Sequence, residues 1–159
     1  MPPQVPAEVA GPLARAHDEA GYALEVVAAR GPQETRKATL AAARAHRAAG
    51  DAWAQAGGLA NTAQDPRLAQ YALPSDVDEE GALTRLAVKV LDGIAVASAA
   101  ALGDVPAGMR ETYLDSLLLA VTDARALGAP AVAFPGLPEQ AAGTAAPTPS
   151  APAPAPTQG

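Results

Sequence analysis

The two histidines of this chain, His17 and His46, are the side chains whose type and spacing could carry chemistry. Each lies in a stretch with helical periodicity, and they lie about equally far from a predicted turn at Gly31–Pro32. If two helices form a hairpin at that turn, the imidazoles reach the same height on facing surfaces. Two facing imidazoles can bind zinc or copper, or can form a switch that is protonated at about pH 6 to 7. The simpler interpretation, which we favour, is that they are ordinary polar residues in a loosely packed, alanine-rich interface.

A metal site built on two histidines needs at least one more ligand. Asp123 is the first acidic candidate, and Asp18 and Glu19 come next. The hypothesis of a metal site therefore consists of His17, His46 and Asp123, with zinc, iron or copper as the cofactor.

The glutamates that usually accompany such histidines are missing. In ferritin-like di-metal proteins, Glu-x-x-His pairs project inward from two helices. Ala14 and Ala43 occupy the positions three residues before His17 and His46. The main expectation is therefore a chain without catalytic residues and without a cofactor, and the metal site is the alternative.

Four segments with helical periodicity predict an all-α fold, a ferritin-like four-helix bundle with a long crossover between helices two and three. Short turns join the first two helices and the last two. About twenty residues, 57–77, join the pairs; extended, they span roughly 60 Å, enough to return along a helix about 35 Å long. The helices are expected over residues 11–30, 32–56, 83–102 and from about 104 to 128.

Apolar or small residues recur on each helix at steps of three and four, which predicts the inward faces. On the fourth helix Leu114, Leu118 and Val121 widen this face, and we expect the crossover and the segment 133–135 to cover them; a dimer surface is the alternative. The predicted inward residues are Leu13, His17, Ala20, Leu24 and Val27; Thr39, Ala43, His46, Gly50 and Trp53; Leu83, Ala87, Val90, Ile94, Ala97 and Ala101; and Tyr113, Leu117, Ala120, Ala124 and Leu127.

Composition sets the domain organisation. The apolar content of 49% overstates the core, because about a quarter of the residues are alanine and aromatic residues make up only 3%. Without cysteine, disulfides and thiolate metal sites are excluded. We expect a flexible N-terminal segment over residues 1–10, a helical bundle over 11–139, and a disordered tail rich in Ala, Pro and Thr over 140–159.

The net charge of −6 disfavours nucleic-acid binding, which needs positive charge facing phosphates. The first residues lack the pattern of a secretory signal, and charges interrupt the most apolar stretch, 83–102, so we expect a cytoplasmic protein without a membrane span. The negative charge also disfavours a helix lying on a membrane surface.

The second helix carries a stripe of basic residues, which consists of Arg36, Lys37, Arg44 and Arg47. This stripe could dock an acidic partner, or it could be a solvated face on which Arg47 pairs with Asp51.

Two motifs carry a family resemblance: Tyr71–Pro74 before the third helix and Ala133–Glu139 after the fourth. With the alanine-rich helices, they resemble a ferritin-like family of actinobacterial proteins whose domain has no known function. The likeness extends from about Leu13 to Glu139. It implies a ferritin-like bundle and no established activity. Members of that family carry a Glu-His pair ahead of a tyrosine, whereas this chain has His17 and Asp18 there, so no metal role is carried over.

These observations together indicate a non-catalytic binding or interaction module with an unknown protein partner, as a monomer or a homodimer. The alternative is a metal-binding or oxidoreductase bundle that uses His17 and His46 with a carboxylate.

Overall fold

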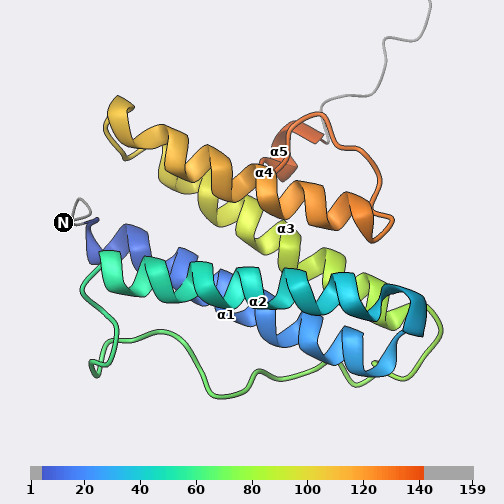
Figure 1. The fold of residues 1–159 in the computed structure, drawn as a ribbon. Helices are drawn as coiled ribbons and strands as arrows, with labels where there is room; N and C mark the ends of the chain where they lie inside the picture. The colour runs from blue at the N-terminus through green and yellow to red at the C-terminus, as the bar shows by residue number, and fades with distance from the viewer. Residues whose placement is uncertain (1–4, 142–159) are drawn as a thin grey trace, which may run out of the picture.

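The computed structural model describes residues 5–141, and over this range the chain is helical, without strands (Figure 1). This confirms the predicted all-α fold with four long helices. Residues 142–159, which include nearly all of the predicted disordered tail, lie outside the described residues. The helices are α1 (Ala7–Arg30), α2 (Gln33–Ala56), α3 (Ala82–Leu102) and α4 (Arg110–Ala126), with a short 3₁₀ turn, η1 (Ala107–Met109), before α4 and a last short helix, α5 (Pro138–Ala141).

The four helices form two hairpins that pack on each other. α1 packs on α2 and on α3, and α3 packs on α4, whereas α2 and α4 make few direct contacts. The connection 57–81 runs back along the outside of the α1–α2 hairpin, so that α2 and α3 run in the same direction (Figure 1). None of the helices within residues 5–141 is both long and apolar enough to cross a membrane.

α1 begins earlier than predicted. The rule that proline favours the first helical turn placed the start at Gly11–Pro12, but the helix begins at Ala7 and Pro12 lies inside it. Burial explains the difference: Val5 is buried in the core, and its backbone N–H donates a hydrogen bond to the carbonyl of Ala56 (3.1 Å). Residues 7–10, expected in a flexible segment, thus form the first turn of α1. α4 begins later than predicted, after the turn at 104–109.

Two apolar clusters make up the core. The first gathers large side chains of α1, α2 and α4, among them Leu13, Trp53 and Tyr113. The second lies against α3 and contains Leu24, Leu91 and Ile94. Along α1, His17 lies between the residues that belong to the first cluster and those that belong to the second, so a polar layer interrupts the core.

The predicted inward faces of α1 and α2 are confirmed, since all ten of their residues are buried. On α3 the buried face is rotated: Leu83, Val90 and Ala97 are only partly buried, whereas the face also includes Leu86, Leu91, Ala95 and Ser98. α3 packs against both α1 and α4, which buries a wider arc than one stripe. On α4 only Tyr113, Ser116 and Ala120 are buried.

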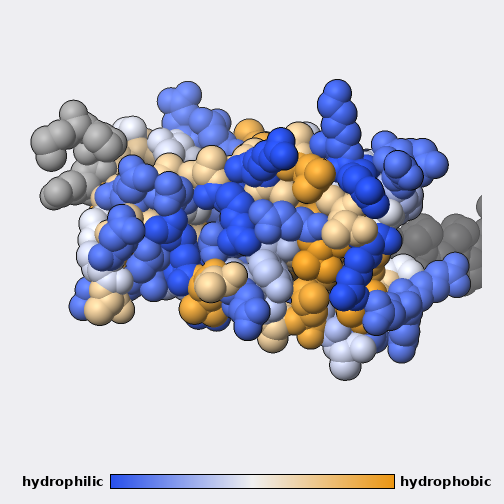
Figure 2. All heavy atoms as spheres, turned by 60° about the horizontal axis from the view of Figure 1, so that its bottom comes forward, coloured by the Kyte–Doolittle hydropathy of each residue, from blue (hydrophilic) through white to orange (hydrophobic). Residues whose placement is uncertain are grey.

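The crossover and the segment 133–135 were expected to cover the outer face of α4, and this is wrong for Leu114 and Leu118, whereas Val121 is partly buried and lines a pocket with Pro135. Leu114 and Leu118 are exposed, Leu118 by 58%. The connection cannot reach them, because its Tyr71 is held against α1 on the opposite side of the molecule. On the face that carries the connection, hydrophilic side chains cover most of the surface and hydrophobic patches lie between them (Figure 2).

α1 and α2 approach most closely where Gly50 faces α1. A Cβ atom at Gly50 would lie 2.9 Å from the carbonyl oxygen of Ala14 and 3.1 Å from the backbone nitrogen of Asp18. Ala14 is itself fully buried. The backbones of α1 and α2 therefore leave no room for a side chain at position 50.

We expect Gly50→Ala to lower the free energy of unfolding by up to about 2 kcal/mol, because overpacking costs about 1–3 kcal/mol and alanine regains about 1 kcal/mol of helix propensity. Gly93→Ala is the matched control, since Gly93 lies on an exposed face of α3 with open space around its Cβ position. That variant should gain about 1 kcal/mol. Urea denaturation of both variants checks the prediction, and equal gains in stability would contradict the close approach of α1 and α2.

Candidate functional site

His17 and His46 face each other across the α1–α2 interface. Both side chains are fully buried, and their Nδ1 atoms lie 3.0 Å apart. The prediction that the hairpin brings both imidazoles to one height is therefore confirmed. The helix periodicity and the turn at Gly31–Pro32 suffice to place them, because the residues between each histidine and the turn form unbroken helix.

Each imidazole has a second polar neighbour on α4. His17 Nε2 lies 2.6 Å from Ser116 Oγ, and His46 Nε2 lies 3.2 Å from Asp123 Oδ2. The N–H of His46 is not aimed straight at the carboxylate, so this last contact is electrostatic rather than a well-formed hydrogen bond. Ser116, His17, His46 and Asp123 thus form one continuous row of side chains, which we call the polar chain.

One arrangement of protons satisfies the polar chain with both imidazoles neutral. His46 keeps its proton on Nε2, toward Asp123, so its Nδ1 is an acceptor. His17 then carries its proton on Nδ1 and donates it to His46, which leaves His17 Nε2 to accept the hydrogen bond that the Ser116 hydroxyl donates. All donors point the same way, from Ser116 toward Asp123.

Burial keeps the two histidines uncharged. Desolvation, together with the nearby His46, lowers the pKa of His17 to about 3. Desolvation also lowers the pKa of His46, although the Asp123 carboxylate acts in the opposite direction. Near neutral pH the polar chain therefore contains two neutral imidazoles and an acidic side chain that is partly open to solvent.

The predicted metal ligands come together, but not around one point. Asp123 lies beside Nε2 of His46, whereas His17 lies beside Nδ1 of the same ring. Within residues 5–141, no three His, Cys, Asp or Glu side chains are grouped as a metal ion would need. Asp18 points to Arg47 and Tyr71, and no hydrogen bond or ion pair joins Glu19 to either imidazole. The metal site stays a prediction, and the observed arrangement consists of the hydrogen bonds at His17 and the electrostatic contact between His46 and Asp123.

A groove opens beside the polar chain because α2 and α4 do not pack closely. Its volume is about 740 Å³, and His17 and Ser116 both line it. We call it the α2–α4 groove. It is lined by Val5; Ala49, Ala52, Trp53, Gln55 and Ala56 of α2; Met109, Thr112, Tyr113, Asp115, Ser116 and Leu119 of η1 and α4; and His17.

Aromatic and polar groups meet inside the α2–α4 groove. The rings of Trp53 and Tyr113 are in contact, with centroids 4.9 Å apart. The Tyr113 side chain is fully buried, and its hydroxyl has no hydrogen-bond partner among the described residues. Ser116 follows Tyr113 by three residues on α4, so the two side chains share one face of the helix.

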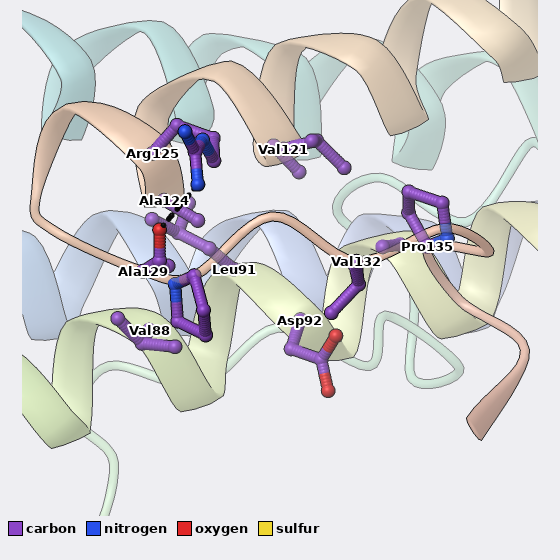
Figure 3. Close-up of a pocket in the computed structure, with 12 residues that line it drawn as sticks. Val88, Leu91, Asp92, Val121, Ala124, Arg125, Ala129, Val132 and Pro135 are labelled. Carbon is purple, nitrogen blue, oxygen red and sulfur yellow. Dashed lines mark hydrogen bonds between the residues drawn. The ribbon is translucent and has the colours of Figure 1, made fainter. Parts of the chain in front are cut away.

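A second pocket, between α3 and α4, is a weaker candidate. The returning segment after α4 covers it, and its volume is about 220 Å³ (Figure 3). Its lining is apolar, as with Leu91 and Val121, and the charged Asp92 and Arg125 lie at its edge, where Arg125 donates a hydrogen bond to the carbonyl of Ala129 (3.0 Å). No buried titratable group faces it, so it offers packing space rather than chemistry.

A second polar network surrounds Arg47, and it corrects the predicted pairing with Asp51. Arg47 donates hydrogen bonds to Asp18 (2.7 Å) and Glu25 (3.1 Å) on α1. Asp51 instead pairs with Arg67 in the connection. Arg47 therefore faces the neighbouring helix rather than running along its own, and its stem fills the space left by Gly21, where a Cβ atom would lie 2.7 Å from Arg47 Cγ.

The two distinctive motifs have structural roles. Tyr71 donates a hydrogen bond to Asp18 Oδ2 (2.9 Å), which fastens the connection to α1. Burial and this bond raise the pKa of Tyr71 to about 12, so the phenol stays protonated. Gly136 has φ of 79° and lies directly against the Ala95 carbonyl, where no side chain would fit.

Sequence reasoning missed Ser116. A signal was present in the sequence. Ser116 and Asp123 are seven residues apart and therefore lie on one face of α4, and Asp123 was already a candidate ligand. The large leucines around Ser116 dominated the predicted inward face.

A family model described as a domain of unknown function, DUF4439, matches residues 12–139. The comparisons with curated proteins and with solved structures found no match.

Proposed function

Because the chain belongs to the DUF4439 family, whose description names no activity, we propose a function from the site alone: the α2–α4 groove binds a small amphipathic organic molecule. The observation that carries this proposal is the groove itself, with buried polar groups beside aromatic walls. Its volume falls in the range of about 300–1,000 Å³ that is usual for small-molecule sites.

The lining predicts the chemistry of the ligand. Trp53, Met109 and Leu119 offer apolar contact to a hydrocarbon or aromatic portion. The Tyr113 hydroxyl, which has no hydrogen-bond partner among the described residues, can donate to a polar acceptor such as a carbonyl, and it would gain that partner on binding. The Ser116 oxygen can accept a hydrogen bond while its proton stays directed at His17. The Asp115 carboxylate at the groove disfavours an anionic ligand, so we propose a neutral one.

Trp53 provides a direct test, because it is the single tryptophan of the chain and lines the groove. We expect 1-aminoanthracene, a neutral fluorescent aromatic amine, to bind saturably at one site and to accept excitation energy from Trp53. Ala52→Phe should weaken this binding about tenfold, or about 1.4 kcal/mol, because Ala52 is an exposed residue of the lining and phenylalanine would fill the space.

The matched control is Ala41→Phe, which adds the same side chain at an exposed position of α2 away from the groove. It should bind the dye like the unmodified chain. If Ala52→Phe and Ala41→Phe bind equally well, the dye occupies another site and the proposed function is wrong.

The architecture around the groove supports a ferritin-like arrangement: two antiparallel hairpins joined by a long connection, as the resemblance implies (Figure 1). The alternative function, a metal-binding or oxidoreductase bundle, draws support from the facing imidazoles of His17 and His46. It would be favoured if zinc, iron or copper raised the unfolding temperature of the chain but not that of a His17→Leu/His46→Leu variant.

A further inference from the structure

Ser116 combines two properties that a structural serine does not need. It lines the α2–α4 groove with 8% of its surface exposed, so a bound molecule can reach it. Its hydroxyl also lies 2.6 Å from the Nε2 atom of His17, at the end of the row formed with His46 and Asp123. A hydroxyl that contacts an imidazole, itself oriented by further groups, is the arrangement that activates serine as a nucleophile.

We propose that Ser116 is a nucleophile that cleaves neutral carboxylic esters in the α2–α4 groove, with His17 as its base and His46 and Asp123 as positioning residues. This inference rests on the proposed function, because the apolar part of the ester must occupy the groove.

The polar chain is set to remove the Ser116 proton. His17 Nε2 is free to accept it, since the other nitrogen of the ring carries the proton that bonds to His46. When His17 takes up the Ser116 proton on Nε2, it can pass its Nδ1 proton to Nδ1 of His46. His17 then stays neutral in its other tautomer, and the positive charge rests on His46 beside the Asp123 carboxylate.

This relay suits the burial of the two rings. A lone cation on His17 would be costly in its fully buried position, whereas His46 has a carboxylate 3.2 Å away to compensate the charge. Asp123 is the charged group that faces the pair from α4. On α1 and α2 the charged side chains next to the histidines in the sequence, Asp18 and Arg47, are bonded to each other.

The reaction balances along this path. The Ser116 oxygen forms a bond to the ester carbonyl carbon while its proton moves to His17 and the carbonyl electron pair moves onto oxygen. The carbon–oxygen bond to the alcohol then breaks, and the alcohol leaves with the proton that returns through His17. A water molecule attacks the acyl group on Ser116 by the same route, which releases the acid and restores the serine.

Tyr113 is the side chain that would stabilise the negative oxygen. Its hydroxyl is buried and has no hydrogen-bond partner among the described residues, and the residue itself stands about one helical turn before Ser116 on the same face of α4. Burial raises the pKa of Tyr113, so the phenol remains a hydrogen-bond donor. The backbone N–H groups of α4 are used within the helix, so the donor must be a side chain such as Tyr113.

The test uses the full chain with p-nitrophenyl butyrate as substrate and a fluorophosphonate as a covalent probe. We expect slow hydrolysis with butyryl-enzyme on Ser116, and probe labelling of the peptide that contains Ser116. Ser116→Ala should abolish labelling and lower hydrolysis at least about 100-fold. The matched control is Ser98→Ala, since Ser98 is a buried serine of α3 that does not line the groove; this variant should react like the unmodified chain.

Asp123→Asn distinguishes a positioning role from a structural one. Without the carboxylate the histidine pair loses its proton at lower pH, so the acid limb of the pH–rate profile should shift to lower pH while the maximal rate falls. A change in rate without a shift of the limb would assign Asp123 a structural role only and would overturn the relay.

A second variant, Ser116→Cys, tests the proposal even if Ser116→Ala fails to fold. The chain has no cysteine, so Ser116→Cys carries a single thiol, which the polar chain should deprotonate. Its alkylation by iodoacetamide should be at least tenfold faster than that of Ser98→Cys near neutral pH. Saturable binding of 1-aminoanthracene with no hydrolysis, no labelling and slow alkylation would overturn the nucleophile and leave the proposed function intact. If the unmodified chain does not bind 1-aminoanthracene saturably, the proposed binding function of the α2–α4 groove is itself wrong.

Discussion

Between about pH 7.5 and about pH 4.5, the free energy of unfolding is expected to fall by about 2.7 kcal/mol because of His17 alone. Its pKa is lowered from 6.5 to about 3 by burial and by the nearby His46. Below pH 6.5 His17 is therefore protonated in the unfolded chain but stays neutral in the folded chain. The contribution of His17 to stability is therefore fully present above its pKa in the unfolded chain, and it is lost as the pH falls toward its pKa in the folded chain. His46 adds to the loss, since its pKa is also lowered.

Urea denaturation as a function of pH measures this effect. Asp65, whose pKa the hydrogen bond from Arg67 lowers to about 2, changes charge mostly below this window and does not overlap with the histidines. In the His17→Leu/His46→Leu variant the slope of stability against pH should almost vanish, because both partners are replaced together and no buried imidazole remains. A double variant that loses stability as steeply as the unmodified chain would mean that the histidines are not the acid-sensitive groups.

Arg47→Met is expected to lower the free energy of unfolding by about 2–4 kcal/mol. Removing one partner of a buried ion pair typically costs about 3–5 kcal/mol, and the partial exposure of Arg47 reduces that figure. The variant leaves the buried carboxylate of Asp18 with Tyr71 as its remaining hydrogen-bond partner. Methionine keeps an apolar stem over Gly21, so the loss reports mainly on the missing charge.

The neighbouring Arg44→Met is the control, since Arg44 is exposed on α2; its effect should stay within about 0.5 kcal/mol. Adding Asp18→Asn to Arg47→Met should recover part of the loss, because an amide is cheaper to bury unpaired than a carboxylate. If Arg47→Met proves as mild as Arg44→Met, the pair with Asp18 contributes no more than a surface ion pair.

The contacts behind these two predictions differ in how well the sequence alone predicts them. The facing histidines follow from helical period and turn position, which are local properties, and Gln33–Ala56 has nearly the predicted bounds for the same reason. The partner of Arg47 does not follow locally. Spacing along α2 favoured Asp51, four residues later, but the close approach of α1 at Gly21 and Gly50 brings Asp18 nearer.

The sequence by itself determined the all-α class, the four long helices, and the height at which His17 and His46 meet, because these depend on periodicity within about thirty residues. It also showed that alanine, at Ala14 and Ala43, stands three residues before each histidine, where Glu-x-x-His pairs would carry glutamate. Only the tertiary structure decided what the histidines contact. The placement of α4 brings Ser116 and Asp123 to opposite ends of the pair and opens the α2–α4 groove beside Ser116. Such contacts depend on how the two hairpins dock. His17 and Ser116 are 99 residues apart in the chain, and no local pattern encodes a contact over that separation.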